Sequence, residues 1–480
     1  MERLSGLDAS FLYLETPAQL LHVCGLIEVD GGTIDGGYTF AKLKKELAQR
    51  VRAMPGFRRK LQDSFLNLDH PVWVEDKHFD IDQHLHRIAV PAPGGPDEVA
   101  ELCAHIAGQP LDRTRPLWEM WVIEGLGNGH IAVMSKMHHA TVDGVSGANM
   151  MSQLCTLTPA APPADEADLA RNAGDAGTLG LAVDGMLSFA ARPLKLLQML
   201  PGTAAVLPKW ISRSRHGRAM PAPFTAPRTS FNGTITGHRE IAYTQVPLDD
   251  VKEVKNAFGC KLNDVVLAMC SGALRKYLDE RNELPDTSLV AMVPVSVHGK
   301  SKRPGTNQVT GMFTTLRTDV DDPARRLAEI SAHNLVAKEH KDALPAGLLQ
   351  DAAQFAGPAL FGAAMRAYAS LRLAEHHPVI HNLVISNVPG PPVPLYFVGA
   401  RIEAMYPLGP VFHGAGLNIT VFSLDGELNI GLIGCRELTS TLWPLAQAMR
   451  DSLADLLSAA RAGSDQSGTA PRRTPPAAQE

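Results

Sequence analysis

Two adjacent histidines, His138 and His139, stand at the centre of the most distinctive stretch of this sequence. They are followed by three small residues, an aspartate and a glycine. A neutral imidazole accepts a proton near pH 7 and passes it on, which is the work of a general base. Asp143 could orient an imidazole, pair with a buried arginine or cap the following helix, and Gly144 permits a tight turn. These residue types therefore allow proton-transfer chemistry. Two histidines in a turn can also be structural, or bind a metal with Asp143, although no CxxC or HExxH motif accompanies them.

The neighbouring segments indicate how the histidines are held. Residues 131–137 form a short, largely apolar run that predicts a buried strand, and residues 145–157 mix small and apolar residues in a way that predicts a helix. Consecutive side chains on a strand point to opposite faces, so only one of the two histidines can face a shared cleft. We expect the other imidazole to pack or hydrogen-bond behind it.

The spacing HHxxxDG, given by His138, His139, Asp143 and Gly144, resembles the signature of the acyl-CoA-dependent acyltransferase superfamily. That superfamily includes chloramphenicol acetyltransferase, carnitine acyltransferases and peptide-synthetase condensation domains. From about residue 4 to about residue 460 the chain looks like the bacterial wax ester synthase/diacylglycerol acyltransferase family, of the kind numerous in mycobacteria. The segments that carry this resemblance are LSGLD at 4–8, HV at 22–23, PLW at 116–118, APRT at 226–229, Asn263-Asp264 as the ND motif, and Ser386-Asn387-Val388-Pro389-Gly390-Pro391. One departure is Leu-His-Val-Cys at 21–24, where family members often have Met and Gly around the HV pair.

The resemblance implies an α/β fold with two chloramphenicol-acetyltransferase-like domains and the active site in a tunnel at their interface. His139 would be the general base at the midpoint of this tunnel, with acyl-CoA entering from one side and a hydroxylated lipid from the other. No acyl-enzyme is needed, which predicts a ternary complex. Asp143 is expected to form an ion pair that supports the turn. Candidate donors to the oxyanion, or groups that position the substrate, are Asn263, Ser386 and Asn387. For Asp264 we expect a helix-capping role. The resemblance also implies that the ND motif, Asn263 and Asp264, lies close to the active-site histidine and helps to position that histidine or the substrate.

The length of 480 residues exceeds one compact domain and predicts two cores. We expect an N-terminal acyltransferase domain with the HHxxxDG motif over residues 1–157, and a linker with an apolar and basic helical segment over 158–227. A C-terminal acyltransferase-like domain should follow over 228–462, with a disordered tail over 463–480. The linker begins with an Ala/Pro/Asp-rich stretch that has no hydrophobic period.

Hydrophobic periodicity predicts regular elements in both halves. Helices are expected over 38–54, 97–109, 249–258, 262–279, 323–340 and 441–461, with an alanine-rich helical region over 346–375 that Pro358 interrupts. Strands are expected over 118–124, 289–297, 310–316, 382–388, 417–424 and 427–435, the last two joined in a hairpin by Asp425-Gly426. The irregular spacing of four histidines predicts solvated loop residues and not metal ligands: His70, His78, His84 and His86.

A possible membrane-surface element lies in the linker. Residues 179–200 predict a mostly apolar helix with a narrow polar stripe, kinked at Pro193, and four basic residues follow it, Lys209, Arg213, Arg215 and Arg218. A wide apolar face followed by basic residues is typical of a segment that lies on a membrane. A domain-bridging helix buried against the protein explains the pattern equally well. The need to reach a lipid acceptor favours membrane contact.

Composition narrows the partners and the compartment. A formal charge of −5 argues against a nucleic-acid-binding protein. Six cysteines without paired spacing suit a reduced cytoplasmic protein, and the N-terminus lacks the apolar core of a signal peptide. We therefore expect a cytoplasmic enzyme, peripheral on the inner membrane face or on lipid droplets if membrane contact holds, with no cofactor and no metal beyond its acyl-CoA substrate.

The expected reaction is transfer of a long-chain fatty acyl group from acyl-CoA to diacylglycerol, which gives triacylglycerol. The alternatives are a wax ester synthase that uses long-chain alcohols, and a catalytically inactive lipid- or membrane-binding homologue. The intact HHxxxDG, PLW and ND segments weigh against the inactive homologue. A condensation domain is disfavoured because no carrier-protein segment with a serine attachment motif accompanies the chain.

Overall fold

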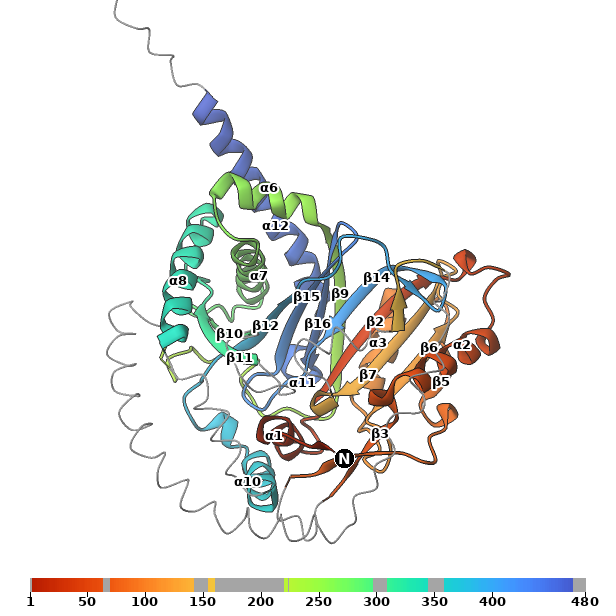
Figure 1. The fold of residues 1–480 in the computed structure, drawn as a ribbon. Coiled ribbons are helices and arrows are strands. Elements are labelled where there is room, and N and C mark those ends of the chain that lie inside the picture. Colours follow the sequence, from red (N-terminus) through yellow and green to blue (C-terminus); the bar gives the residue numbers. More distant parts are fainter. Residues whose placement is uncertain are drawn as a thin grey trace, which may run out of the picture.

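The computed structural model of the chain describes residues 2–63, 70–141, 154–159, 220–222, 224–296, 309–343 and 358–468. In these residues two large β-sheets lie side by side, with a small three-stranded sheet near the N-terminus and helices around them (Figure 1). The small sheet consists of β1 (Glu2–Arg3), β4 (Val72–Glu75) and β3 (Arg59–Gln62). The predicted two-domain α/β fold class is confirmed.

The seven-stranded sheet has the order β5-β6-β7-β2-β14-β13-β8. Its strands are β2 (His22–Asp30), β5 (Leu85–Ala89), β6 (Trp118–Glu124), β7 (Ile131–His138), β8 (Cys155–Thr156), β13 (Tyr396–Phe397) and β14 (Ala400–Leu408). Every residue of β7 is buried between β6 and β2, which confirms the predicted buried strand. Because Cys155–Thr156 pairs with β13, the helix predicted over 145–157 is wrong at its C-terminal end.

The six-stranded sheet has the order β11-β10-β12-β15-β16-β9. Its strands are β9 (Arg239–Pro247), β10 (Val290–Ser296), β11 (Val309–Thr315), β12 (Leu383–Val388), β15 (Leu417–Leu424) and β16 (Glu427–Cys435). The predicted hairpin joins β15 and β16, and both of its turn residues have positive φ, 47° at Asp425 and 88° at Gly426. Such a turn matches the twist of the two strands.

Helices pack on the six-stranded sheet and bury a large apolar core. They are α6 (Leu248–Phe258), α7 (Leu262–Asp279), α8 (Pro323–Ala343) and α12 (Trp443–Gly468). All four confirm predicted helices, but α12 continues to Gly468, so the predicted start of a disordered tail at residue 463 is wrong. No single described helix is long and apolar enough to span a membrane; α6 and α7 meet that criterion only together and are bent by 105°.

The remaining helices belong mostly to the first half. They are α1 (Gly6–Leu14), α2 (Phe40–Ala53), α3 (Pro96–Ala107), α10 (Pro358–Ser370), α11 (Arg436–Thr439) and the short 3₁₀ helices η1 (Gly31–Thr33), η2 (Pro55–Arg58), η4 (Ile81–Gln83), η5 (His139–Thr141) and η7 (Leu373–Glu375). Helix α10 starts at Pro358, where proline is favoured in the first helical turn, and it ends at Ser370, five residues before the predicted end. Residues 346–357 of the predicted alanine-rich region lie outside the described residues. The predicted helices over 38–54 and 97–109 are confirmed by α2 and α3.

The two sheets share a core. Helix α3 packs on β9 of the six-stranded sheet, and its apolar side chains meet residues of β2, β14 and β16. In this shared core the rings of Tyr243 and Tyr406 lie 4.4 Å apart, and Trp443 lies 5.3 Å from Tyr243. Residues 396–408, within the predicted C-terminal domain, complete the sheet of the N-terminal half (Figure 1). The predicted linker over 158–227 lies almost entirely outside the described residues, and so does the helix predicted over 179–200.

Two of the four histidines that we predicted to be solvated are buried. The Nδ1 of His84 lies 2.8 Å from the Trp118 carbonyl oxygen, and its ring stacks on the Trp118 indole at 4.6 Å. His70 is buried against Tyr13, whose hydroxyl lies 3.0 Å from its Nδ1. His78 is exposed, as predicted. The prediction failed because each buried imidazole finds an aromatic and a polar partner on an element distant in sequence.

Candidate active site

The turn that carries His139 is held by backbone hydrogen bonds on both sides. The N–H of His139 donates to the Leu21 carbonyl at 2.8 Å, and the N–H of His138 donates to the Leu117 carbonyl at 3.0 Å. The Thr141 hydroxyl donates to the His138 carbonyl at 2.7 Å and closes the turn. Leu21 directly precedes the HV pair, and Leu117 is the centre of PLW. Two of the sequence motifs therefore fix the backbone at which the catalytic candidate stands.

The His139 imidazole is half-buried and stacks on Phe11 of α1, with ring centroids 4.1 Å apart and an interplanar angle of 22°. Burial lowers the pKa of His139 to about 4, and the neighbouring His138 acts in the same direction, against an opposing interaction with its own backbone. The ring is therefore neutral at pH 7 and able to accept a proton. Its Nδ1 is buried without a hydrogen-bond partner among the described residues. That burial leaves Nε2 as the nitrogen with access to a substrate.

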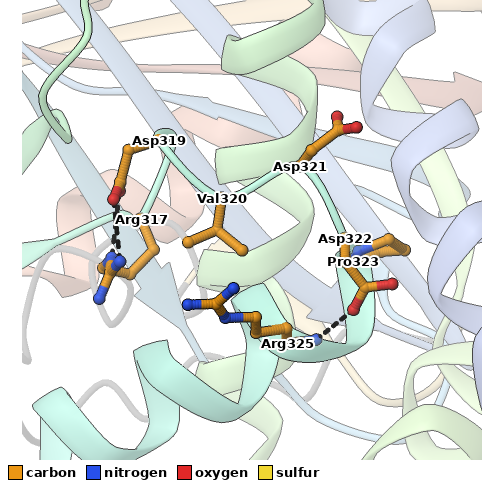
Figure 2. A pocket seen from close by; sticks show the side chains of 7 residues that line it. All are labelled: Arg317, Asp319, Val320, Asp321, Asp322, Pro323 and Arg325. Carbon is orange, nitrogen blue, oxygen red and sulfur yellow. Dashed lines mark hydrogen bonds and ion pairs between the residues drawn. The ribbon is translucent and has the colours of Figure 1, made fainter.

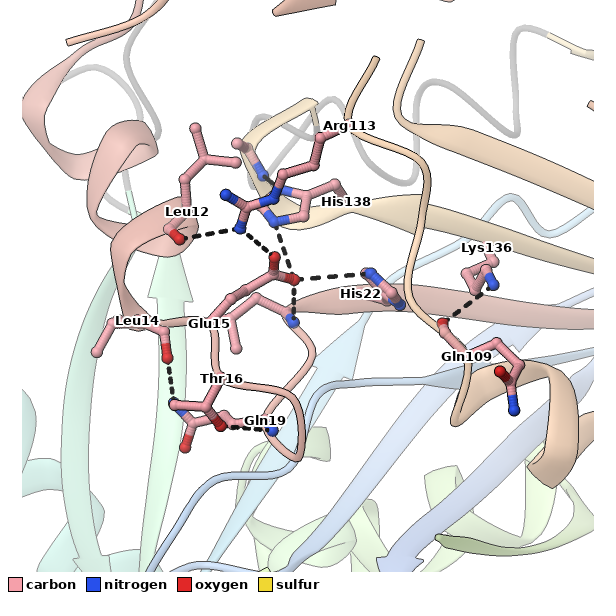
Figure 3. Close-up of polar contacts among 12 residues, drawn as sticks. Leu12, Leu14, Glu15, Thr16, Gln19, His22, Gln109, Arg113, Lys136 and His138 are labelled. Atoms are coloured by element: carbon pink, nitrogen blue, oxygen red, sulfur yellow. Dashed lines mark hydrogen bonds and ion pairs between the residues drawn. The ribbon is translucent and has the colours of Figure 1, made fainter. Parts of the chain in front are cut away.

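The His138 imidazole points to the other side, as the alternation along a strand predicts. It is 1% exposed, its Nδ1 accepts the Ala140 N–H at 3.0 Å, and its Nε2 lies 3.2 Å from Glu15 Oε1 (Figure 3). Because Nδ1 is used as an acceptor, Nε2 is the nitrogen that can carry a proton toward the carboxylate. His138 thus links Glu15 to the backbone just after His139.

Glu15 directly follows α1 and is the centre of a buried polar network (Figure 3). Its carboxylate accepts the Leu21 N–H at 2.9 Å and a guanidinium N–H of Arg113 at 2.5 Å, and the Nε2 of His22 lies 3.6 Å away. Burial by itself raises the pKa of Glu15, but His138, Arg113 and His22 together outweigh it and hold the pKa at about 2. Glu15 is therefore a charged group behind the catalytic turn.

His22 is opposite His138 in the β2–β7 pairing, with ring centroids 6.0 Å apart. Burial lowers the pKa of His22 to about 3 in spite of the attraction of Glu15, so the ring is neutral at pH 7. The Glu15 carboxylate therefore faces the imidazoles of His22 and His138 and the permanently charged guanidinium of Arg113. The HV pair of the family resemblance has a physical role here, because His22 fills the space beside Glu15.

Sequence reasoning missed Glu15 and Arg113. The only available sign was a lone carboxylate, Glu15, between an apolar run and Thr16-Pro17. Nothing in the local pattern connects it with His138 on a distant strand. The association arises only when α1 packs against η5, the turn that contains His139.

A buried lysine anchors the strand that leads into this turn. The Nζ of Lys136 lies 3.0 Å from Glu119 Oε2 and donates to the carbonyls of Ile106 and Gln109 at 3.3 and 3.2 Å. These carbonyls lie at the C-terminal end of α3, where the helix dipole favours a cation. Lys136 therefore ties β7 to α3 and fixes the strand in the shared core.

The other predicted members of the motif, Asp143 and Gly144, lie outside the described residues, so the predicted ion pair of Asp143 stays a prediction.

In the second half the structure brings two predicted residues together. The Nδ2 of Asn387, near the end of β12, donates to the Oδ1 of Asn263, in the first turn of α7, at 3.3 Å. Both side chains are half-buried. Ser386 precedes Asn387 on β12 and pairs with Thr420 of β15, so strand alternation turns its side chain to the other face. No described residue accepts a hydrogen bond from the Asn263 amide nitrogen, which leaves it able to donate elsewhere. The oxyanion role of these three residues stays a prediction.

Asp264 is a structural residue, as we expected. It is buried and accepts hydrogen bonds from the Lys261 N–H at 3.1 Å, the Ser331 hydroxyl at 3.0 Å and the Asn334 amide at 2.8 Å. The first of these satisfies an amide at the start of α7, and the other two tie α7 to α8. The ND motif thus combines a helix cap with the neighbouring Asn263.

Replacing Asp264 with alanine should lower the free energy of unfolding by about 3 kcal/mol, because one buried and two part-buried donors lose their acceptor. Chemical denaturation measures this change. The control is Asp249→Ala on α6, where the carboxylate is 87% exposed and pairs only with Lys252. We expect the control to change stability by less than about 0.5 kcal/mol. Equal effects of the two substitutions would contradict the assignment.

A separate polar hollow of about 600 Å³ lies where β11 leads into α8 (Figure 2). Arg317 donates to Asp319 at 2.8 Å, and Asp322 accepts the N–H of Arg325 at 2.7 Å (Figure 2). Arg317 and Arg325 both also pair with Glu329. The hollow is thus lined by charges that pair with one another, and it contains none of the predicted site residues. Among the described residues no group of three or more His, Cys, Asp or Glu side chains is arranged to hold a metal ion.

Comparison with solved structures defines the class of protein. The fold matches the wax ester synthase/diacylglycerol acyltransferase from Marinobacter aquaeolei VT8 with a TM-score of 0.69 and 31% identity, covering 96% of this chain and 100% of that one. The first condensation domain of the calcium-dependent antibiotic synthetase matches with a TM-score of 0.54 at 15% identity, over 96% of each chain, and shares the fold alone. Fold and site together define a two-domain acyltransferase with a tandem-histidine turn.

Comparison of sequences gives the family. Residues 4–266 match the wax ester synthase/diacylglycerol acyltransferase catalytic domain, and residues 305–457 match the WS/DGAT C-terminal domain. A putative diacylglycerol O-acyltransferase of Mycobacterium tuberculosis is 51% identical over 95% of this chain and 90% of its own length. The probable diacylglycerol O-acyltransferase tgs2 of the same species is 35% identical over 94% and 97%. The chain belongs to the wax ester synthase/diacylglycerol acyltransferase family, which confirms the resemblance seen in the sequence motifs.

Proposed function

We propose that this enzyme transfers a long-chain fatty acyl group from acyl-CoA to the free hydroxyl of diacylglycerol and so makes triacylglycerol. The observation that carries the proposal is His139, a half-buried and neutral imidazole on a turn fixed by family motifs. The names of the M. tuberculosis relatives, both diacylglycerol O-acyltransferases, support this choice of acceptor.

In the proposed mechanism the Nε2 of His139 takes the proton of the acceptor hydroxyl while that oxygen attacks the thioester carbonyl. The tetrahedral intermediate then collapses, the C–S bond breaks, and the proton passes from His139 to the departing coenzyme A thiolate. Attack by the alcohol itself requires both substrates to be bound together, in contrast to a covalent acyl-enzyme route. Our candidate donor to the oxyanion is the amide N–H of Asn263, which no described residue accepts and whose Oδ1 is held by Asn387.

The remaining parts of the proposal concern partners and location. We propose that no metal or cofactor takes part, because the alcohol attack and thiolate departure need only a base and a donor. The enzyme would be cytoplasmic and would meet its lipid substrates at the inner membrane face or at lipid droplets. Nucleic acid is not a proposed partner. The second candidate function is wax ester synthesis from long-chain alcohols, which the family name and the Marinobacter structure favour.

The test is coenzyme A release from palmitoyl-CoA by purified enzyme, with diacylglycerol and hexadecanol supplied separately and the neutral lipids resolved. Triacylglycerol formation is the expected result. Wax ester alone would keep the mechanism and replace the acceptor. If neither acceptor stimulates thiol release while the protein still binds lipid vesicles, the inactive, lipid-binding homologue becomes the better description.

The low pKa of His139 predicts an unusual pH profile. A base is active when it is deprotonated, that is, above its pKa, so a pKa of about 4 keeps His139 active as the pH falls from 7.5 to 5.5. We expect kcat/KM to lose less than about a tenth over this interval, whereas an ordinary imidazole would lose ~10-fold. Glu15, with a pKa of about 2, stays charged throughout.

The control for this experiment is a return of each sample to pH 7.5 before a second assay, which separates protonation from irreversible loss of structure. A reversible tenfold decline centred near pH 6.5 would show that His139 titrates like an exposed histidine, and would contradict the burial seen in the structure.

A further inference from the structure

We propose that an exposed apolar corner, formed by Phe224, Leu371, Leu373 and Ile380, docks this enzyme on an anionic lipid surface that supplies the acceptor. The inference rests on the proposed function, since diacylglycerol is a water-insoluble lipid, and adds the surface through which the enzyme meets it. The four side chains are 53%, 64%, 40% and 36% exposed. Large apolar side chains gathered on one surface are typical of a contact with a membrane or another protein.

Two chain segments build this corner by lying side by side. Ala226 forms an isolated antiparallel bridge with Val379, and Arg228 donates to the carbonyls of Ala374 and His377 at 3.2 and 2.6 Å. The ring of Phe224 meets the His377 ring edge-on, at 6.4 Å. The segment from Phe224 to Arg228 therefore runs along η7 and the residues that follow it, and the four apolar side chains share one region of the surface.

The corner is held firmly by polar contacts beneath it. The Tyr368 hydroxyl, in α10, lies 2.6 Å from Nε2 of His377, and the Nδ1 of His377 lies 2.7 Å from the Pro378 carbonyl. Arg372 has φ of 50° where α10 gives way to η7, and the sharp bend presents Leu371 and Leu373 on either side of it. The apolar side chains are thus displayed by fixed backbone.

The charge of this region fits an anionic lipid surface. Between residues 358 and 381 the sequence contains two arginines, Arg366 and Arg372, and one carboxylate, Glu375. Glu375 pairs with Arg372 at 2.7 Å, which leaves the exposed Arg366 without an opposing carboxylate in this stretch. Arg228 adds a further positive charge, although the whole chain carries −5. A local positive balance beside exposed leucines is the combination that anionic membrane surfaces attract.

Two packed helices, α10 and α1, connect the corner with the catalytic turn. Helix α10 packs on α1 (Figure 1). The backbone of Gly362 in α10 comes near the carbonyl of Tyr13 in α1, where an added Cβ would be 3.9 Å away. Helix α1 in turn places Phe11 against the His139 ring. Among the described residues, α10 and α1 thus connect the corner to the His139 turn.

The test compares vesicle binding and activity of Phe224→Glu/Leu371→Glu with those of wild type. Vesicles of phosphatidylcholine and phosphatidylglycerol, containing diacylglycerol, are sedimented with the protein. We expect the apparent dissociation constant to rise about tenfold or more, because two apolar side chains are lost and two negative charges are added. Triacylglycerol synthesis from vesicles should fall in parallel, whereas turnover of a water-soluble short-chain diacylglycerol should be unchanged.

The matched control is Leu335→Glu on α8, where the leucine is 55% exposed but belongs to another surface. Equal weakening by Leu335→Glu, or vesicle binding that the double variant retains, would overturn the proposal. So would a change of dimer to monomer on gel filtration with unchanged vesicle binding, because the corner would then contact a second copy of the chain. If wild type makes no triacylglycerol but the double variant still loses vesicle binding, the docking surface stands and the proposed reaction fails.

Discussion

Replacing His139 with alanine is expected to lower kcat by about a thousandfold, since a positioned general base contributes ~10²–10⁴ to the rate of proton transfer. No other described imidazole shares its position: the Nδ1 of His138 accepts the Ala140 N–H, and its Nε2 faces Glu15 at 3.2 Å. The ring of His139 is only half-buried and packs on Phe11 alone among aromatic neighbours, so alanine should leave the fold intact. Single-turnover coenzyme A release with both substrates bound measures the change.

The matched control is His78→Ala, which removes an exposed histidine from the same half of the chain. It should keep wild-type kcat. Thermal unfolding of both variants should follow that of the wild type. A His139→Ala enzyme with near-normal turnover would exclude His139 as the base and leave the site without a proton acceptor that the structure supports.

The second large decrease in kcat is expected for a substitution of Glu15. We describe Glu15 as a positioning residue because it acts through His138 and the turn. Glu15→Gln keeps the size of the side chain and an oxygen for the Leu21 N–H, but it removes the charge that faces Arg113 and His138. The amide can also present N–H where His138 needs an acceptor. With His138 free to rotate, the Ala140 N–H loses its partner and the turn at His139 loosens. We expect kcat to fall about 10–100-fold, as second-sphere changes near a catalytic group often do.

The assay must separate positioning from simple loss of stability. Saturation kinetics should show a lower kcat with KM for acyl-CoA almost unchanged, because Glu15 is buried behind the turn and His139 stands on the other side. Glu403→Gln, an exposed glutamate on β14, serves as the control and should behave as wild type. If Glu15→Gln has normal kcat at a temperature where it is folded, the buried network has only a structural role.

Local patterns in the sequence predicted most elements of the fold. Buried β7 and the helices α2, α3, α7 and α8 follow from short runs whose apolar spacing matches a strand or a helix, and each needs information from neighbouring residues only. The pairing of β14 with β2 was not predicted. Alternation of apolar and polar residues indicates a strand, but it does not indicate which other strand that strand pairs with. Strand alternation predicted that the two imidazoles point to opposite sides, and the family resemblance indicated that His139 is the one that faces the substrate.

The candidate site was also predicted only in part, because the sequence does not show contacts between distant segments. The motif indicated His138 and His139, and chemistry of residue types indicated a base. What the sequence could not show is why His139 is neutral and why His138 is held. The first depends on burial of the His139 ring, which stacks on Phe11 of α1, and the second on Glu15, which directly follows α1. The apparent loop histidines His70 and His84 were misjudged for the same reason, because their aromatic partners come from other elements.

The crossing of β14 has a consequence for how the chain is made. In the order β7-β2-β14, β2 pairs with β7 along one edge and with β14 along the other. The second edge therefore stays unpaired until residue 408 has been synthesised. Until then the first half leaves the ribosome with the edge of β2 unpaired, and an unpaired edge strand is a site of aggregation. A strand pair separated by most of the chain also closes late, since long loops must be ordered first. The catalytic half of this enzyme therefore completes its sheet only when residues 396–408 arrive from the other half.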